Sequence, residues 1–397
     1  MTKLYRAACV TTAVLGLGLF AQAHAATRNV GAGQPYATPC RAFAAAVSGD
    51  LIQIYAGTYV GDVCGIYASN ITIRGVNGRP KIDAGGRNAM GKGIWVVVGN
   101  NVTIDNVEMF GAKVPDLNGA ALRLEGTHFT LRKSFLHDNQ NGILSGANLN
   151  SDILIENSEF GHNGYGTGQT HNLYIGTVRS LTFRYNFSHD AHVGHNLKSR
   201  AQTNKILYNR FSSLRPGEVG STAAGQPSYE IDLPNAGTSY IIGNVIQQPA
   251  ANQNGSLVSY GTEGATNPGK NLYVVNNTFL NDDTARGNFV LVGSGVTVPI
   301  LLQNNIFAGI GTLTNQASPS QKTNYRSVAP GFVNRAAYDL RPTANPLVVD
   351  AGSTPGYAPT GVVLNAVAEY DHLALGRHRP SPGIDIGAYE ASSATAP

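Results

Sequence analysis

A short cycle repeats along the middle of the chain and constrains the fold more than any other feature. Each copy has a segment of alternating apolar residues, an Asn or similar polar turn residue, and then an apolar or aromatic anchor. A repeat of this kind predicts a solenoid whose turns each contain several short strands and pack only on their neighbours. The spacing runs from 24 to 35 residues, and the anchors are Met109, Phe135, Phe160, Phe187, Phe211, Ile246, Phe279 and Phe307.

The composition fits strands and tight turns better than helices. The chain has 397 residues, of which 47 are glycine, and only 13% of residues are charged. A formal net charge of +4, without a run of Lys and Arg, gives no support for a nucleic-acid partner. Although the length alone would suggest two or three domains, a solenoid can grow as one domain. We therefore expect a single all-β domain.

Residues 1–25 have the pattern of a secretory signal peptide. Two basic residues, Lys3 and Arg6, precede an apolar run over 7–20, and Ala-His-Ala at 23–25 fits the small-x-small cleavage rule. The apolar run is too short to span a membrane, and no other segment qualifies; an uncleaved anchor is the alternative. We expect a protein secreted to the periplasm or the cell exterior, with no membrane span.

Residues 26–60 are predicted to form a cap and the first strand. The segment 40–47, CRAFAAAV, has one apolar face, as a short helix would, and 51–59 alternates like a strand. A short helix here would cover the open N-terminal end of the solenoid. The mature chain keeps two cysteines, Cys40 and Cys64, which can pair in an oxidising compartment and tie the cap to the first turn.

The strand cycle resembles the right-handed parallel β-helix proteins over roughly residues 50–310. We accordingly predict a right-handed parallel β-helix over 61–320, followed by a closing block and tail over 321–397. That block resembles the C-terminal block of secreted bacterial β-helix proteins, and Asp385, Gly387 and Glu390 of its DIGAYE sequence carry the resemblance. The resemblance implies that the block covers the C-terminal end of the coil.

The densest group of chemically versatile residues lies between 171 and 232. Two near repeats, HNLY at 171–174 and HNLK at 195–198, are 24 residues apart, and YEIDL follows at 229–233. Because side chains alternate along a strand and neighbouring strands lie about 4.8 Å apart, the polar members should form one exposed patch with His171 and His195 at its edge. The members expected on the outside are Asn172, Tyr174, Asn196, Lys198, Arg200, Glu230 and Asp232.

The patch also has a purely structural interpretation. An exposed solenoid face must be polar, so Lys198 with Asp232, or Arg200 with Glu230, could be surface ion pairs contributing about 0–1 kcal/mol each. The combination of His, Tyr, Lys and Arg on a chain with few charges favours a functional site instead.

The residue types suit β-elimination from a uronate sugar. In that reaction the carboxylate is neutralised, a base removes the adjacent proton, and an acid assists the departing oxygen. Asn196, Arg200 or a Ca²⁺ ion held by Glu230 and Asp232 could neutralise the carboxylate. The candidate bases are Lys198 and His195, the candidate acids are Tyr174 and His171, and Asn172, Asn196 and Tyr229 would contact the substrate.

The patch resembles the sites of β-helix lyases such as chondroitinase B and the alginate lyases. Those enzymes use a Lys/Arg pair beside a calcium ion held by Asn and acidic ligands. The same residue types occur here, although the basic residues precede the acidic pair. The resemblance implies an acidic polysaccharide substrate, lyase chemistry and Ca²⁺ as a candidate cofactor.

Three other functions are also compatible with the patch. Glu230 and Asp232 have backbones roughly 6.6–6.8 Å apart if they share a strand, which is close to the carboxyl separation of inverting glycoside hydrolases, about 6.5–9.5 Å. A uronate epimerase would begin with the same proton removal. A non-catalytic carbohydrate-binding β-helix would use aromatic platforms such as Tyr165, Tyr174 and Tyr229. In every case we expect a monomer that binds an acidic polysaccharide.

Three histidines near the patch are predicted to be structural. A Phe-x-His-Asp/Asn sequence recurs at 135–138, 160–163 and 187–190. A residue that recurs at the same place in each turn favours a stacked corner ladder, so His137, His162 and His189 are assigned to one.

Overall fold

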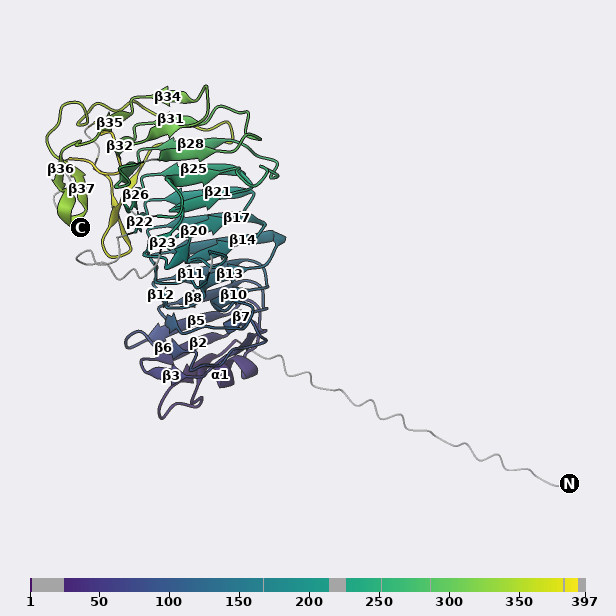
Figure 1. The fold of residues 1–397 in the computed structure, drawn as a ribbon. Helices are drawn as coiled ribbons and strands as arrows, with labels where there is room; N and C mark the ends of the chain where they lie inside the picture. Colours follow the sequence, from purple (N-terminus) through teal and green to yellow (C-terminus); the bar gives the residue numbers. More distant parts are fainter. Residues whose placement is uncertain are drawn as a thin grey trace.

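The computed structural model describes Met1 and residues 25–166, 168–213, 226–250, 252–285, 287–380 and 383–391. The predicted signal peptide lies almost entirely outside these residues. In the described part of the chain, three long parallel sheets wind into a coil (Figure 1). The predicted all-β, right-handed parallel β-helix is confirmed.

The strands of the three sheets follow one another in rotation along the chain, so each turn of the coil contributes one strand to each sheet. Among the described residues, sheet A has 12 strands, sheet B 11 and sheet C 10. Sheet A consists of β1 (Thr27–Val30), β2 (Leu51–Tyr55), β5 (Thr72–Val76), β8 (Val102–Asp105), β11 (Phe129–Arg132), β14 (Asn148–Glu156), β17 (Val178–Arg184), β21 (Thr203–Leu207), β25 (Thr238–Ile242), β28 (Leu272–Val275), β31 (Leu301–Gln303) and β34 (Ser320–Lys322).

Sheets B and C complete each turn. Sheet B consists of β3 (Thr58–Val60), β6 (Lys81–Asp83), β9 (Glu108–Phe110), β12 (Phe135–His137), β15 (Glu159–Gly161), β18 (Phe187–His189), β22 (Arg210–Ser212), β26 (Val245–Gln248), β29 (Thr278–Asn281), β32 (Ile306–Gly309) and β35 (Tyr325–Ser327). Sheet C consists of β4 (Cys64–Ile66), β7 (Gly93–Val97), β10 (Ala120–Leu124), β13 (Asn141–Ser145), β16 (Leu173–Ile175), β20 (Leu197–Ser199), β24 (Ile231–Leu233), β27 (Ser256–Tyr260), β30 (Asn288–Val292) and β33 (Thr312–Thr314). A small pair, β19 (Val193–Gly194) with β23 (Gln226–Pro227), lies outside these sheets.

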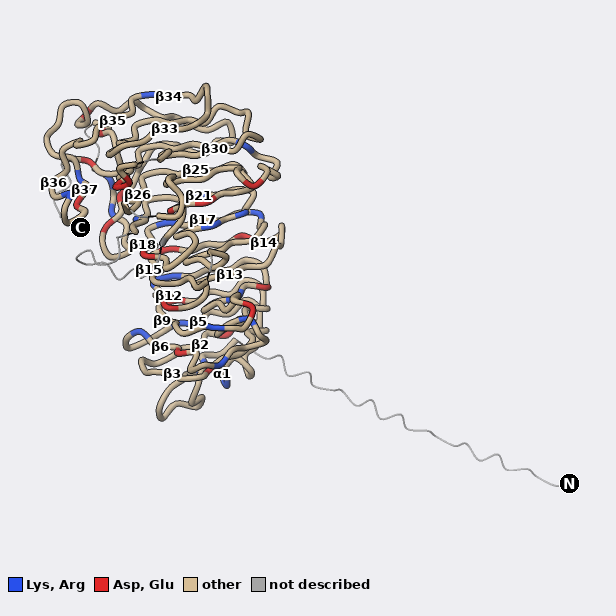
Figure 2. Tube along the Cα trace, viewed as in Figure 1, with Lys and Arg blue, Asp and Glu red and all other residues tan. Residues whose placement is uncertain are grey.

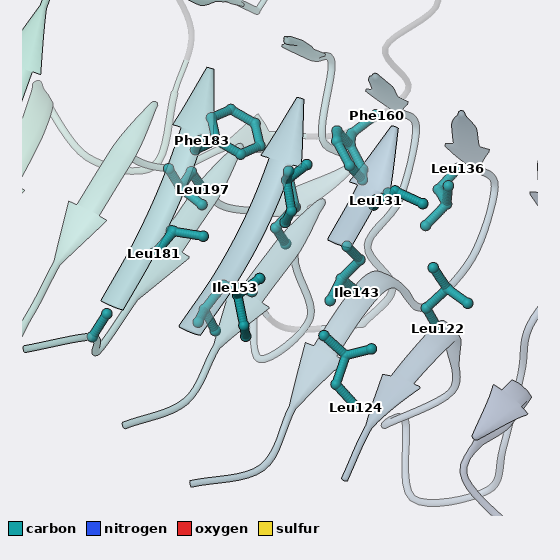
Figure 3. Packing of buried hydrophobic residues seen from close by; sticks show 14 of the residues in the cluster. Leu122, Leu124, Leu131, Leu136, Ile143, Ile153, Phe160, Leu181, Phe183 and Leu197 are labelled. Atoms are coloured by element: carbon teal, nitrogen blue, oxygen red, sulfur yellow. The ribbon is translucent and has the colours of Figure 1, made fainter. Parts of the chain in front are cut away.

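The core consists of columns of apolar side chains inside the coil. Register pairs Leu131 with Ile155, Ile155 with Phe183 and Phe183 with Ile206, and all four are fully buried. Figure 3 shows such residues from neighbouring turns, Phe160 and Phe183 among them, pointing into the space between the strands. Burial of each large apolar side chain contributes about 1.5–3 kcal/mol. The period-two alternation therefore selects which face of each strand is inside.

Two of the predicted anchors lie one residue out of register. The column of Met109 and Phe160 continues through Leu136, not Phe135, and through Ser188, not Phe187. Phe135 and Phe187 face outward and stack on His137 and His189, each with ring centroids 4.1 Å apart. A one-residue slip moves a side chain to the other face of a strand, which is why the spacing alone misplaced them.

An uninterrupted row of asparagines occupies the corner between sheets A and B, and we call it the A–B ladder. From the second member on, each side-chain oxygen accepts from the backbone N–H and side-chain amide of the Asn one turn earlier; Asn244 does so for Asn209, at 2.9 Å each. These bonds satisfy polar groups that the turn would otherwise bury unpaired. The ladder consists of Asn186, Asn209, Asn244, Asn277, Asn305 and Asn324.

The predicted N-terminal cap is present. Helix α1 (Pro39–Ala45) packs on the first turns, and the ring of Phe43 meets that of Trp95 edge-on at 5.0 Å. The predicted disulfide Cys40–Cys64 is confirmed and links α1 to β4. No helix in the described residues is long and apolar enough to cross a membrane.

Residues beyond the coil form β36 (Phe332–Asn334), the 3-10 helix η1 (Arg335–Ala337), β37 (Asp339–Pro342), β38 (Ala368–Asp371) and β39 (Leu375–His378). The resemblance implied that this block covers the end of the coil, but its last part lies along the flank (Figure 1). Asn157 donates to Ala374 O, and Tyr208 accepts from Val367 N–H. The block packs on the flank because the outer face of the later turns carries apolar side chains there, such as Tyr240 and Tyr273.

The DIGAYE sequence holds this block together and packs it against the coil. Asp385 accepts from the backbone N–H of Asp350, and Glu390 pairs with the buried Arg379 at 2.5 Å. Gly387, at φ 107°, approaches the coil so closely that a Cβ would lie 2.7 Å from Ile306. The three residues that suggested a closing block therefore each have a structural role.

Candidate active site

The outer face of sheet C carries one side chain per turn in a single column. Register aligns Arg123 with Leu144, then Tyr174, Lys198 and Asp232. We call this the groove column, because it lies along a groove with a cavity of about 560 Å³ that Arg123, Tyr174 and Lys198 help to line. The predicted outward direction of Tyr174, Lys198 and Asp232 agrees with this register, but Lys198 and Asp232 are buried in the groove and not exposed as expected.

A charge network joins the floor of the groove to its edge. Lys198 Nζ lies 3.1 Å from Asp232 Oδ2 and 2.7 Å from Glu263 Oε1, and Arg200 reaches Glu263 Oε2 at 2.5 Å. The Asp232 side chain is 2% exposed, whereas that of Glu263 is 45% exposed. Lys198 is thus held from below by a buried carboxylate and covered from above by one that solvent can reach.

The two carboxyl groups are affected differently by their surroundings. Burial raises the pKa of Asp232, and the contact with Lys198 offsets this only in part. Burial by itself would also raise the pKa of Glu263, but the hydrogen bonds from Lys198 and Arg200 outweigh this effect, so the pKa of Glu263 is lowered. Glu263 is therefore an anion bound between two cations.

Arg200 connects the groove column to a second group. Its Nε donates to the Tyr174 hydroxyl oxygen at 2.7 Å, and its guanidinium lies 5.7 Å from the centre of the Tyr174 ring. It also donates to Asn235. Because the Tyr174 oxygen accepts from Arg200, the Tyr174 proton is available to another acceptor.

His171, His195 and Tyr229 form a stack beside the groove. The two imidazoles are 4.7 Å apart and nearly parallel, and Tyr229 follows at 5.2 Å. His171 Nδ1 accepts from the backbone N–H of His195, and His195 Nδ1 accepts from that of Tyr229, both at 3.1 Å. Since a backbone N–H can only donate, both rings are neutral with the proton on Nε2.

This arrangement conflicts with the predicted acid or base roles of the histidines. Burial, and then the charge of Lys198, lower the pKa of His195 to about 3; burial and the charge of His195 lower that of His171 well below its ordinary value. The one lone pair that a base would need is engaged by the backbone in each ring. The histidines instead position the turns, and His195 Nε2 lies 3.4 Å from Asp232 Oδ2.

Asn172, Asn196 and Glu230 do not face outward as predicted. They are at most 1% exposed and belong to a row inside the corner between sheets B and C, which we call the B–C ladder. Asn172 donates to Asn196 Oδ1 at 2.7 Å, and Asn196 donates to Glu230 Oε2 at 2.5 Å. The prediction was wrong because these residues precede their strands, at corners where alternation does not hold. The row consists of Asn139, Asn163, Asn172, Asn196 and Glu230.

The proposed calcium pair does not fit this geometry. Glu230 ends the B–C ladder, and burial raises its pKa to about 8. Asp232 lies in the groove column, where Lys198 already binds its Oδ2. Because the two carboxyl groups belong to separate networks and one favours its neutral form, they do not provide the paired anionic oxygens that Ca²⁺ requires.

Glu263 and Asn235 were missed from the sequence. Both lie in turns after strands of sheet C and interact with Arg200 from one or two turns away. Glu263 also replaces Glu230 as the ion-pair partner considered for Arg200. The available signal was weak: an acidic residue shortly after the strand that follows Asp232.

No family model and no curated protein sequence matches the chain. Among solved structures, the crystal structure of pectate lyase Pel9A aligns with a TM-score of 0.60 at 17% identity, covering 92% of this chain and 96% of that one. A PL6 alginate lyase in complex with a trisaccharide aligns with a TM-score of 0.35 at 14% identity, covering 83% of this chain and 68% of that one. The chain is therefore a parallel β-helix protein that shares its fold with pectate lyase Pel9A.

Proposed function

We propose that this protein is a lyase that cleaves a uronate-containing polysaccharide by β-elimination in the groove of sheet C. The observation that carries the proposal is the convergence of Lys198 and Arg200 on one exposed carboxylate, that of Glu263, with Tyr174 bound to the same Arg200. The name of the structural neighbour, a pectate lyase, points to the same reaction class.

Glu263 indicates where a substrate carboxylate would bind. Two cations, Lys198 and Arg200, each contact one of its oxygens, which is the arrangement expected around a sugar carboxylate. Since its side chain is 45% exposed, an incoming uronate can displace it. Arg200 then neutralises the substrate carboxylate and so acidifies the neighbouring C5–H.

The proton transfers follow from the same geometry. Once Glu263 has left, Lys198 gives one proton to Asp232, which lies 3.1 Å away and whose pKa is raised by burial, and the neutral amine then accepts the C5 proton. The C5 electron pair forms the C4=C5 double bond, and the C4–O bond breaks. Tyr174 donates its proton to the departing oxygen, because its own oxygen is already held by Arg200. The products are a new free chain end and an unsaturated uronate.

The competing functions receive less support from this site. A hydrolase would need two paired carboxyl groups, and Glu230 and Asp232 lie in separate networks. An epimerase would share the first proton transfer but return the proton to C5. A binding protein would retain the polymer unchanged. The Cys40–Cys64 disulfide fits a location outside the cytoplasm, as the predicted signal peptide does.

The test is the absorbance of the unsaturated uronate. Purified chain without residues 1–25 is incubated with alginate, pectate, glucuronan and a glycosaminoglycan, each with Ca²⁺ and with a chelator. We expect absorbance to rise with at least one polymer, and to fall about 10²–10⁴-fold in rate in Lys198→Met. Lys205→Met removes a lysine from the outer face of sheet A and is the matched control, expected to keep the full rate.

The alternatives give distinct results. New reducing ends without absorbance would indicate hydrolysis, and exchange of the C5 proton with solvent without cleavage would indicate epimerisation. Retention of polymer without any reaction would indicate a binding protein. Each of these outcomes contradicts the lyase proposal.

A further inference from the structure

The repeat is interrupted at the corner that follows sheet B. Register aligns His137, Gly161 and His189, so glycine stands in the histidine position of the middle turn. His162 instead follows that position, as Asp190 does in the next turn, and both have left-handed backbone with φ of 55° and 46°. The predicted ladder of His137, His162 and His189 is therefore wrong, because His162 is offset by one residue.

The interruption brings two different histidines and a carboxylate together. Because Gly161 has no side chain, the ring of His189 leans over it; a Cβ on Gly161 would lie 2.7 Å from His189 Nε2. As a result, one ligand atom from each of His162, His189 and Asp190 lies within 4.8 Å of the others. A regular ladder would have stacked like residues at the distance of one turn instead.

The surroundings hold two of these groups and expose the third. His189 is buried, stacks on Phe187 at 4.1 Å, and has Glu159 3.3 Å from its Nε2. Asp190 is 4% exposed and lies 3.0 Å from His189 Nδ1. His162 is only partly buried, so the cluster is open to solvent on its side.

We propose that His162, His189 and Asp190 bind a divalent first-row transition metal such as Zn²⁺. Two imidazoles and one carboxylate are a common ligand set for this class of ion, with bonds of about 2.0–2.2 Å, so that two ligand atoms of one tetrahedral ion lie about 3.3–3.6 Å apart. The three atoms already lie within 4.8 Å of one another, and the side chains would rotate toward one another to bind the ion. His192, whose ring lies 5.9 Å from that of His162, and Glu159, which lies 3.3 Å from His189 Nε2, are candidates for a fourth ligand.

The ion would stabilise the loops that lead to the groove. His162 precedes β16, which carries Tyr174, and His189 and Asp190 precede β20, which carries Lys198. A metal bound there would cross-link two successive turns just before these strands. The site is nevertheless separate from the proposed lyase chemistry, and its existence does not depend on that reaction.

The test uses untagged protein stripped with a chelator and then titrated with Zn²⁺ or Co²⁺ in a calorimeter. We expect about one equivalent to bind, visible absorption bands from the Co²⁺ form, and a higher melting temperature with Zn²⁺. His162→Ala changes the most exposed ligand and is expected to weaken binding at least about 10-fold and remove the thermal shift. Asp190→Asn is a second variant with the same expectation.

His128→Ala is the matched control. His128 is a half-exposed histidine that also lies near a carboxylate, 3.6 Å from Asp152, but directly precedes β11 of sheet A and is remote from the cluster in the chain. Its variant is expected to bind the metal as the unchanged protein does. Equal affinity in His162→Ala and the unchanged protein, or no binding in the unchanged protein, would overturn the proposal.

Discussion

The A–B ladder and the groove column both place one side chain per turn along the coil, but they differ in composition and exposure. The ladder repeats Asn from turn to turn, and Asn209, Asn244 and Asn277 are at most 1% exposed. The groove column changes at each turn, from Arg123 to Tyr174, Lys198 and Asp232. Repetition allows every turn to satisfy the same backbone groups, whereas variation brings unlike groups into contact. Departures from the repeat therefore mark the places where chemistry is expected.

The B–C ladder is intermediate between the A–B ladder and the groove column in composition. It repeats Asn until Glu230, where the last amide is replaced by a carboxyl group. That residue lies in the same turn as Asp232, so the ladder ends beneath the charge network of the groove. In Figure 2, by contrast, charged residues are scattered along the coil and neither sign forms a continuous stripe.

Asn244→Ala should have the largest effect, because it removes one member of the A–B ladder. The variant leaves the buried N–H of Asn209 and the carbonyl of Ile206 without their partner, at about 1–3 kcal/mol for each group. We expect a loss of roughly 2–6 kcal/mol in the free energy of unfolding, measured as a lower urea midpoint, with the elimination rate per folded molecule unchanged. The exposed Asn150→Ala should change stability by less than about 0.5 kcal/mol. A specific loss of activity in Asn244→Ala would contradict the separation of the two columns.

Glu230 gives a pH dependence that an Asn-only ladder would lack. Its pKa rises from 4.5 in the unfolded chain to about 8 in the folded chain, so its contribution is fully present below pH 4.5 and is lost as the pH rises to 8. Urea midpoints measured at pH 5, 6.5 and 8 should therefore fall by more in the unchanged protein than in Glu230→Gln. We expect the difference in the free energy of unfolding between the two proteins to change by a few kcal/mol from pH 5 to pH 8. Parallel curves would show that Glu230 does not titrate in this way.

Tyr174→Phe tests the groove column without removing a charge. The variant keeps the ring on Arg200 but loses the proton that we assign to the departing oxygen. We expect the elimination rate to fall about 10²-fold, while the free energy of unfolding, measured with urea, changes by less than about 0.5 kcal/mol. Tyr67→Phe, at an exposed tyrosine beside β4, is the control and should keep the full rate. A Tyr174→Phe variant with full activity would remove Tyr174 from the mechanism.

The smallest expected effect is that of Glu263→Gln. The change removes the negative charge that Lys198 and Arg200 bind in the free protein. Uronate then no longer has to displace a bound carboxylate, and the KM for the polysaccharide should fall severalfold. Stability should change by less than about 1 kcal/mol, because the Glu263 side chain is 45% exposed. Initial rates over a range of polymer concentrations measure this. An increase in KM would mean that Glu263 binds the substrate directly.

Much of the architecture could be predicted from local features of the sequence. Alternation along each strand, Asn at the turns and the recurrence of anchors are enough to predict a parallel β-helix. The same alternation correctly placed Tyr174, Lys198 and Asp232 on one outer face. Cys40 and Cys64 predicted the bridge between the cap and the first turn. These features are local, because an extended backbone alone decides which side chains share a face.

The arrangement at the corners and between turns depends on the folded chain. Asn172, Asn196 and Glu230 point inward because corner residues leave the period of the strand. Phe187 faces outward and His162 meets His189 because register is set by pairing with neighbouring turns, and a shift of one residue reverses the face. Glu263 reaches Lys198 from a turn 65 residues further along the chain. The sequence determined the coil, whereas the folded structure determined which residues meet in it, because contacts between turns depend on pairing that no single turn encodes.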